Sequence, residues 1–283
     1  MIHTIHDQTF DGERALYHLQ GETVENCVFA GAADGESALK ECRDLTVRSC
    51  RFSLRYPLWH ARGLRVSDTV LEDTARAPLW YCTDATLSGC TADAVKAVRE
   101  CERIALTDCI LRSPEFGWRC RGITMDDCTL HSEYALFGTR AGTIRRLTMS
   151  GKYSFQYTAD LIIEDAVLDT KDAFWHSKNV TVRDSVVSGE YLGWYSEGLT
   201  LERCRIRGTQ PLCYCDRLTL IDCTMEDTDL SFECSEVNAT IRGTVLSVKN
   251  PRAGQIIADD YGAVLIEDPV MPTDCRVMRR MNV

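Results

Sequence analysis

Residues 101–119, CERIALTDCILRSPEFGWR, and residues 120–138, CRGITMDDCTLHSEYALFG, carry the same classes of residue in the same order. When each stretch is numbered from 1 to 19, cysteine occupies positions 1 and 9, apolar side chains occupy 4, 6 and 11, and an aromatic side chain occupies 18. We term each stretch a rung and each shared position a column. A fixed period over most of a chain is typical of stacked supersecondary units. The register begins at Cys82, Cys101, Cys120, Thr139, Thr158, Ser177, Ser196, Cys215 and Cys234, with earlier starts at Cys42, Ala61 and, less regularly, Leu19.

Within each rung the apolar residues alternate as they do in a β-strand. Columns 4 and 6 are apolar, and the residue between them is often threonine, which suits an outward strand position. A second short strand is expected through columns 9 and 11, and a third as the chain approaches column 17. No window has the apolar stripe of a helix. The pattern predicts an all-β, single-stranded, right-handed parallel β-helix with rungs of about 19 residues.

A leucine-rich-repeat-like solenoid is the alternative, because its LxxLxLxxNxL core resembles the CxxLTVxxCxF pattern of residues 42–52. That fold has a helix or 3₁₀ segment on its convex side. Here the residues after column 11 carry Pro, Gly and aromatic side chains, as in SPEFGWR at 113–119. These residues favour the β-helix.

The continuous repeat predicts one domain over residues 1–283, with an N-terminal cap at 1–18, rungs at 19–246 and a C-terminal cap at 247–283. Caps are expected because an open end would leave an unpaired sheet edge. The rung from Ala61 to Tyr81 holds two extra residues, which predict a local bulge.

The composition restricts partners and location. The net charge of −10 disfavours nucleic acid and anionic membrane surfaces, and no apolar run is long enough to span a bilayer. Thirteen of the fifteen cysteines fall in columns 1 and 9, which elsewhere hold small residues, so they are interpreted as inward-packing free thiols. Reduced thiols and an N-terminus without a signal-like segment predict a cytoplasmic protein. We expect no cofactor and no metal, since Cys213 and Cys215 lack a second ligand pair.

Column 8 is rich in aspartate, interrupted by arginine. A metal-binding acidic ladder is conceivable, but aspartate is also a turn former, and the arginines relieve like-charge stacking. We interpret this column as structural. Its members are Asp108, Asp127, Arg146, Asp165, Asp184, Arg203 and Asp222.

Column 18 contains all five tryptophans of the protein. It also contains Lys40, Arg99 and Gln156, and long polar side chains are seldom buried unpaired. Column 17 is mainly apolar and is the better inward column, so strand alternation sends column 18 outward. An inward aromatic stack is the alternative, because a corner near column 19 could break the alternation.

Column 19 adds histidine, tyrosine, glutamate and arginine beside the tryptophans. An exposed aromatic wall with polar edges is typical of a ligand platform or of a protein interface, for instance in a homodimer. Arg99 between Trp80 and Trp118 would form a cationic notch suited to an anionic sugar or another small acid. The predicted ligand-binding residues are Trp59, His60, Trp80, Tyr81, Arg99, Glu100, Trp118, Arg119, Trp175, His176, Trp194 and Tyr195.

Three segments resemble a bacterial family known only as a domain of unknown function: CRDLTVRSCRFSLRYPLWH (42–60), DAFWHSKNVTVRDSVV (172–187) and GEYLGWYSEGLTLERC (189–204). Members of that family look like single-stranded right-handed β-helices of the pectin-lyase-like superfamily. The resemblance supports the fold and implies no known activity. The wider superfamily is rich in polysaccharide lyases and hydrolases, so the implied ligand class is carbohydrate.

An enzyme would need a catalytic pair of residues. Glycoside hydrolysis uses carboxyls about 5 Å or about 6.5–9.5 Å apart, and the columns offer Glu115 with Glu133 and Asp172 with Glu190. A lyase would need a base beside a positive group, for which Lys96, Arg99, Glu100 and Arg119 are the nearest set; a surface salt-bridge network is the competing interpretation. Three hypotheses remain: a carbohydrate-binding protein, a dimerisation scaffold and a cytoplasmic polysaccharide-active enzyme.

Overall fold

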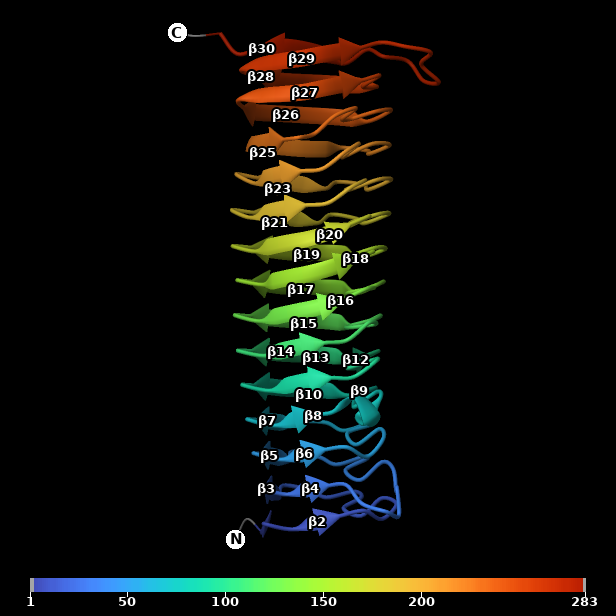
Figure 1. The fold of residues 1–283 in the computed structure, drawn as a ribbon, viewed down its shortest axis with the longest axis vertical. Helices are drawn as coiled ribbons and strands as arrows, with labels where there is room; N and C mark the ends of the chain where they lie inside the picture. Colours follow the sequence, from blue (N-terminus) through green and yellow to red (C-terminus); the bar gives the residue numbers. More distant parts are fainter. Residues whose placement is uncertain (1–2, 282–283) are drawn as a thin grey trace. The chain divides into compact units, whose positions relative to one another are not determined.

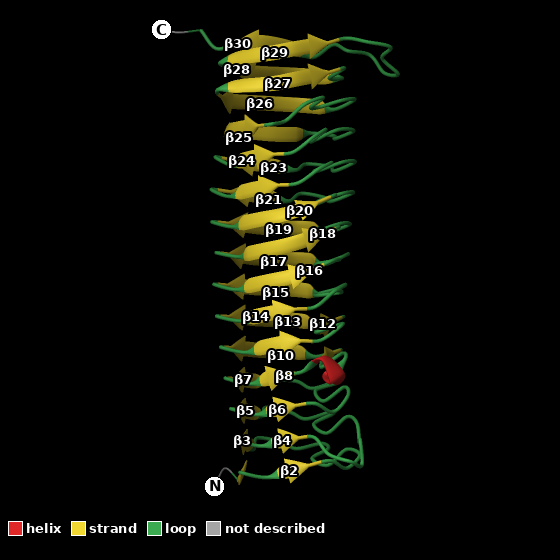
Figure 2. Cartoon of the chain, in the orientation of Figure 1, coloured by secondary structure: helices red, strands yellow, loops and turns green. Residues whose placement is uncertain are grey.

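The computed structural model describes residues 3–281. The chain divides into two compact units, residues 1–143 and 144–283, and each is described by itself. The single domain predicted over 1–283 therefore stays a prediction. Within the described residues the regular elements are strands and one 3₁₀ helix, η1 (Asp73–Ala75) (Figures 1 and 2). A leucine-rich repeat has a helix or 3₁₀ segment in each rung. Among the described residues only one rung has such a segment, so this alternative is excluded.

In the first unit each rung contributes one strand around columns 2–7 and another around columns 10–13. Strands of the same kind pair in parallel from rung to rung, as in Ile104 of β13 opposite Ile123 of β15. The first set comprises β1 (Thr4–His6), β3 (Thr23–Glu25), β5 (Thr46–Arg48), β7 (Arg65–Ser67), β10 (Thr83–Ser88), β13 (Glu102–Thr107) and β15 (Arg121–Asp126). The second comprises β2 (Thr9–Phe10), β4 (Val28–Phe29), β6 (Arg51–Phe52), β8 (Val70–Leu71), β11 (Thr91–Asp93), β14 (Ile110–Arg112) and β16 (Thr129–Ser132).

The second unit repeats this arrangement beyond β17 (Arg140–Arg145), the strand that contains the boundary. Its first set comprises β19 (Ala159–Glu164), β21 (Thr181–Arg183), β23 (Thr200–Glu202), β25 (Leu218–Glu226), β26 (Glu236–Arg242), β28 (Ala253–Ala258) and β30 (Arg276–Arg279). Its second comprises β18 (Thr148–Lys152), β20 (Val167–Lys171), β22 (Val186–Ser188), β24 (Arg205–Arg207), β27 (Thr244–Lys249) and β29 (Asp260–Leu265), while β25 is long enough to serve both sets.

Parallel pairing from rung to rung, in most rungs at the offset of Thr83 with Glu102 and of Thr181 with Thr200, confirms the predicted β-solenoid. The apolar side chains of columns 4, 6 and 11 are buried in both units, and so are those of column 17. Identical columns stack directly on each other: the rings of Phe29 and Phe52 lie 4.4 Å apart, and those of Phe155 and Phe174 lie 5.0 Å apart. Each unit therefore has a continuous apolar core inside its coil.

The predicted third strand is largely wrong. Among residues 3–281 it forms only as β9 (Leu79–Trp80) and β12 (Val98–Arg99), and turns replace it in most other rungs. The reason is backbone conformation: Tyr153, Phe155 and Tyr157, in columns 15, 17 and 19, all have φ between 55° and 60°. Left-handed residues at alternate positions bend the chain and prevent an extended strand.

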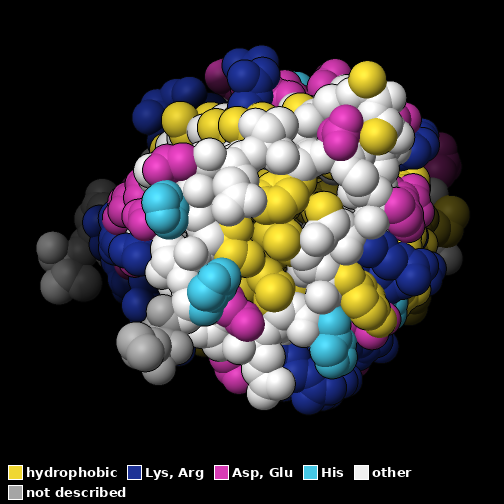
Figure 3. Space-filling view, turned by 90° about the horizontal axis from the view of Figure 1, so that it is seen from below, with side chains coloured by type: hydrophobic (Ala, Val, Ile, Leu, Met, Phe, Trp, Pro, Cys, Tyr) yellow, Lys and Arg dark blue, Asp and Glu magenta, His cyan; other side chains and the backbone are white. Residues whose placement is uncertain are grey.

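The ends of the coil differ from simple caps. In the predicted N-terminal cap, Thr4 of β1 already pairs with Thr23 of β3. Figure 3 looks at this end and shows hydrophobic side chains at its centre. In the predicted C-terminal cap, β28 and β29 continue the parallel pairing with β26 and β27, as in Glu236 opposite Ala253. The Ala61–Tyr81 rung was predicted to contain a bulge because it has two extra residues. The structure places η1 in this rung.

The cysteines point inward, as predicted. Fourteen of the fifteen are buried, and Cys275 is partly exposed. Buried thiols donate weak hydrogen bonds to backbone carbonyls, as from Cys101 Sγ to the Arg99 oxygen at 3.1 Å. Burial raises the pKa of the Cys42 and Cys50 thiols to about 11, so they are protonated at neutral pH, and their burial also keeps reagents away from them.

We therefore expect a thiol reagent at pH 8 to modify Cys275 first and the fourteen buried thiols only as the protein opens. In denaturant without reductant, all fifteen thiols should react, because stacked inward cysteines pack as free thiols. Mass spectrometry after timed alkylation measures both. Several disulfides in the denatured sample would contradict the free-thiol assignment and the expectation of a reducing, cytoplasmic location that rests on it.

Candidate functional site

The corner formed by columns 17 to 19 gives each column a different exposure. Column 17 points into the core, the tryptophans of column 18 are half-buried, and most of column 19 is exposed, with Tyr81 and Tyr195 each 44% accessible. The prediction that column 18 faces outward is right for the tryptophans. Phe232 falls in column 18 when the sequence is counted, but it is buried. Its rung holds one extra residue, so Phe232 takes the position of an inward column. Its N–H accordingly donates to Pro211 O.

Four of the five tryptophans make the same type of hydrogen bond. The indole Nε1–H of Trp118 donates to the Tyr134 carbonyl at 2.6 Å, sixteen residues later on the next rung. Trp175 and Trp194 repeat this bond at 2.6 and 2.7 Å, and Trp59 donates to Ala77 at 2.7 Å across the longer rung. These bonds orient the indole rings and hold adjacent rungs together.

Rings of column 19, and of column 18 in the second unit, stack on each other from rung to rung, whereas Trp59 and Trp80 in the first unit meet edge to face at 72°. In the first unit, His60 and Tyr81 lie 5.0 Å apart with an interplanar angle of 17°. In the second unit, Trp175 and Trp194 lie 5.5 Å apart at 6°. Rings that stack in parallel cover one another's faces, so the ladder offers ring edges to solvent. Where the rings stack, the aromatic wall predicted from the sequence is therefore a row of ring edges.

Arg99 fills the gap that the sequence suggested as a cationic notch. Its guanidinium lies 5.1 Å from the ring of Trp80 and 4.9 Å from that of Trp118. Nη1 is 3.0 Å from a Glu115 oxygen and Nε is 3.4 Å from Glu100, and the side chain is only 14% exposed. Two carboxylates already neutralise Arg99, so it acts as one layer of the ladder. The salt-bridge interpretation of this cluster fits the geometry.

The predicted site residues fall into two groups. The first unit holds Trp59, His60, Trp80, Tyr81, Arg99, Glu100, Trp118 and Arg119, and the second holds Trp175, His176, Trp194 and Tyr195. Sequence reasoning left out Tyr157 and Tyr214, which extend the second group: their rings lie 4.9 Å from His176 and 5.0 Å from Tyr195. Their position in column 19 was the signal that could have included them.

The carboxylates considered for catalysis have different surroundings. Glu115 is engaged by Arg99 and, at 3.7 Å, by Lys96. Asp172 is buried, and burial raises its pKa; the nearby Lys171 ammonium opposes this rise and the Glu190 carboxylate adds to it. A raised pKa suits Asp172 to the role of a proton donor.

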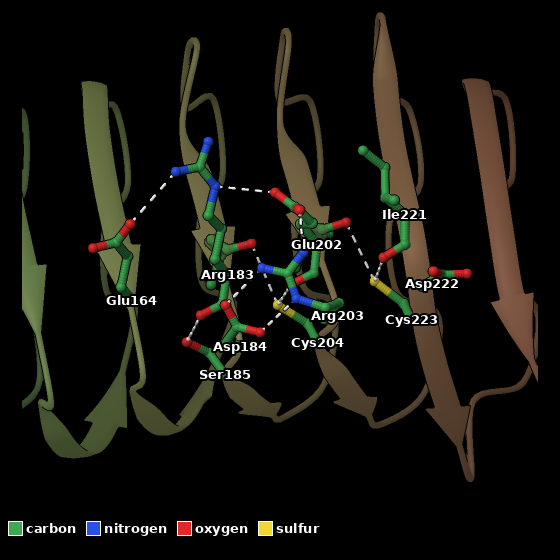
Figure 4. A network of polar contacts seen from close by, with 12 residues as sticks. Glu164, Arg183, Asp184, Ser185, Glu202, Arg203, Cys204, Ile221, Asp222 and Cys223 are labelled. Atoms are coloured by element: carbon green, nitrogen blue, oxygen red, sulfur yellow. Dashed lines mark hydrogen bonds and ion pairs between the residues drawn. The ribbon is translucent and has the colours of Figure 1, made fainter.

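The aspartates of column 8 are structural. Asp184 has φ of 49°, and Arg203 from the next rung contacts both its oxygens at 2.7 and 2.8 Å. Figure 4 shows this pair beside a second ladder, in which Arg183 lies between Glu164 and Glu202. Such exposed pairs contribute little each to stability, ~0–1 kcal/mol. Across residues 3–281 no cluster of three His, Cys, Asp or Glu side chains could hold a metal ion.

Fold and site together define a right-handed parallel β-helix protein with an edge-on aromatic ladder. The chain belongs to the family described as "Protein of unknown function (DUF3737)", whose model matches residues 3–278. No curated relative matches the chain. The helices of the described residues include none long and apolar enough to cross a membrane.

Among solved structures the chain is similar to PfbA, a surface adhesin of Streptococcus pneumoniae, with 7% identity and a TM-score of 0.55 over 94% of this chain and 85% of that one. It also matches the A-module of the mannuronan C-5 epimerase AlgE4 from Azotobacter vinelandii, with 10% identity and a TM-score of 0.32 over 98% and 91% of the two chains. The likeness to PfbA concerns the fold, and the predicted β-helix is confirmed at that level.

Proposed function

We propose that this protein binds a carbohydrate chain along the column 19 ladder of the second unit. The observation that carries the proposal is a row of four stacked rings on consecutive rungs: Tyr157, His176, Tyr195 and Tyr214. Their centroids are 4.9, 5.1 and 5.0 Å apart, and Tyr157 and Tyr195 are 48% and 44% exposed. A ladder with a regular spacing suits a polymer with a regular repeat.

The exposed edges of these rings carry the groups that recognise hydroxyls. A phenol donates and accepts a hydrogen bond, and a neutral imidazole does the same through its two nitrogens. The Tyr195 hydroxyl has no protein partner within the described residues. Burial, together with the Glu233 carboxylate, raises the pKa of Tyr214, so its phenol stays a donor at neutral pH. The ladder therefore offers hydrogen bonds to sugar hydroxyls.

The test removes one hydroxyl. Tyr195→Phe keeps the ring and its stacking on His176 and Tyr214 but deletes the exposed donor. Loss of one hydrogen bond of about 0.5–1.5 kcal/mol should weaken glycan binding roughly 2- to 12-fold. A glycan array followed by isothermal titration with the best oligosaccharide measures this effect.

Tyr81→Phe is the matched control, because Tyr81 is equally exposed and stacked but lies in the first unit. Its affinity should equal that of the wild type. An array without any bound glycan, or equal binding by Tyr195→Phe and the wild type, would count against the proposal.

The same exposed rings also favour a second candidate, a homodimer that covers this face. Light scattering tests the dimer, since Tyr195→Glu would then convert a dimer to a monomer.

The enzymatic alternative rests on buried Asp172. It predicts that a bound glycan is cleaved on prolonged incubation and that Asp172→Asn prevents the cleavage.

A further inference from the structure

A small pocket opens beside Trp80 in the first unit. Its volume is about 130 Å³, and it is lined by Tyr56, Arg76, Ala77, Trp80, Val95 and Lys96. It lies at the bulged rung, where η1 and the two extra residues interrupt the regular corner. A water molecule occupies about 30 Å³ in the liquid, so the space suits a group of a few heavy atoms.

Trp80 breaks the hydrogen-bond rule of its column at this pocket. Trp59, Trp118, Trp175 and Trp194 each donate the indole N–H to a carbonyl of the next rung. Trp80 Nε1 is buried, but it has no acceptor among the described residues. A buried donor without a partner is costly, so an acceptor supplied from outside the chain would be bound favourably here.

Two cationic side chains line the same pocket. Arg76 is exposed and makes no ion pair within the part of the chain that the structure describes. Lys96 Nζ has only one distant partner, a Glu115 oxygen at 3.7 Å, and Arg99 contacts that oxygen more closely at 3.0 Å. The pocket therefore keeps positive charge that the protein does not neutralise.

The backbone fixes the position of Arg76. This residue follows η1 with φ 59° and ψ −71°, a conformation that non-glycine residues rarely adopt, and its N–H donates to the Asp73 carbonyl at 3.1 Å. Strained residues of this kind are found preferentially at binding sites.

We infer that this pocket binds a small oxyanion, a carboxylate or phosphate group, which accepts a hydrogen bond from Trp80 Nε1–H and is held by the charges of Arg76 and Lys96. The inference goes beyond the proposed function, because it concerns the other unit and different residues. The sequence suggested that an anionic ligand would bind at Arg99, but Arg99 is already paired with carboxylates. The inference places the anion at Arg76 and Lys96 instead.

Nuclear magnetic resonance of the full chain labelled with ¹⁵N-tryptophan tests the site directly. Each of the five tryptophans gives one indole N–H signal, and Trp80→Phe identifies the signal of Trp80. Sodium acetate and sodium phosphate are titrated in separate arms at constant ionic strength with chloride. We expect the Trp80 signal to move downfield and saturate in at least one arm, while the signals of the four hydrogen-bonded tryptophans stay in place.

Variants that remove one charge each test the roles of Arg76 and Lys96 in anion binding. Arg76→Gln and Lys96→Gln should each weaken binding of the saturating anion at least fivefold; the first removes an exposed charge, and the second removes a charge whose nearest partner, Glu115, lies 3.7 Å away. Arg112→Gln on β14 is the control, with the same loss of charge outside the pocket, and should bind as the wild type does. A Trp80 signal that does not saturate with either anion, a common shift of all five signals, or unchanged affinity in both pocket variants would overturn the inference. None of these outcomes depends on glycan binding.

Discussion

Val182→Asp is expected to unfold the second unit or to lower its free energy of unfolding by at least about 3 kcal/mol. Val182 is fully buried in the middle of β21, in column 6. On the neighbouring rungs it pairs with Ile163 of β19 and Leu201 of β23, which are also buried. A carboxylate at this position would lose its hydration between apolar layers and would gain no partner. Urea denaturation followed by circular dichroism measures the loss.

Thr181→Asp is the matched control, because it introduces the same charge one residue earlier. Thr181 is half-exposed on the opposite face of the strand, level with Ile162 and Thr200. Its carboxylate would stay hydrated, and we expect a change of less than about 1 kcal/mol. If both variants melted like the wild type, the inward orientation of column 6 would be wrong.

The period made the core predictable from sequence. In a solenoid, every residue of a column meets the same surroundings, so many copies report on one position. Most residues of columns 4, 6, 11 and 17 are apolar, so these columns were predicted to face the core despite exceptions such as Gly117. Cysteines in columns 1 and 9 were likewise identified as packing residues because Ser and Thr replace them elsewhere.

Backbone conformation at the corner could not be predicted in the same way. Left-handed φ angles usually favour glycine, asparagine or aspartate, whereas here Phe155, Phe174 and Leu212 adopt them. Each is buried in the stacked core, and the packing of column 17 outweighs the local preference of the residue. Large apolar residues therefore concealed the turns, and the sequence suggested a strand.

The candidate site was predictable as a surface but not in its detail. Column membership placed the tryptophans and Tyr195 on one face, yet it carries no information on ring orientation, so the loss of open ring faces was missed. The partner of Arg99 is Glu115, from a different column of the next rung. A contact that crosses columns cannot be recognised from a list of columns. The bulge was visible as two extra residues, but the pocket beside Trp80 depends on where η1 places Arg76.

The second large effect is expected at a glycine contact between rungs of the second unit. Gly208 follows β24 with φ +119°, and a Cβ atom there would lie 2.0 Å from the carbonyl oxygen of Gly189 and 2.5 Å from its carbonyl carbon. Those atoms belong to the backbone of the preceding rung and cannot turn aside as a side chain would. Gly208→Ala should therefore separate two paired rungs.

We expect Gly208→Ala to lose at least about 2 kcal/mol of stability, since conformational strain of about 1–3 kcal/mol is joined by the displacement of the backbone. Gly243→Ala isolates the two contributions: Gly243 has φ +81°, but a Cβ atom there would meet nothing within 4 Å. It should show the strain alone, about 1 kcal/mol. Urea midpoints of the two variants give the comparison. Equal losses would mean that the rungs at Gly208 can move apart at no cost, contrary to a stack in which the backbone of one rung sets the position of the next.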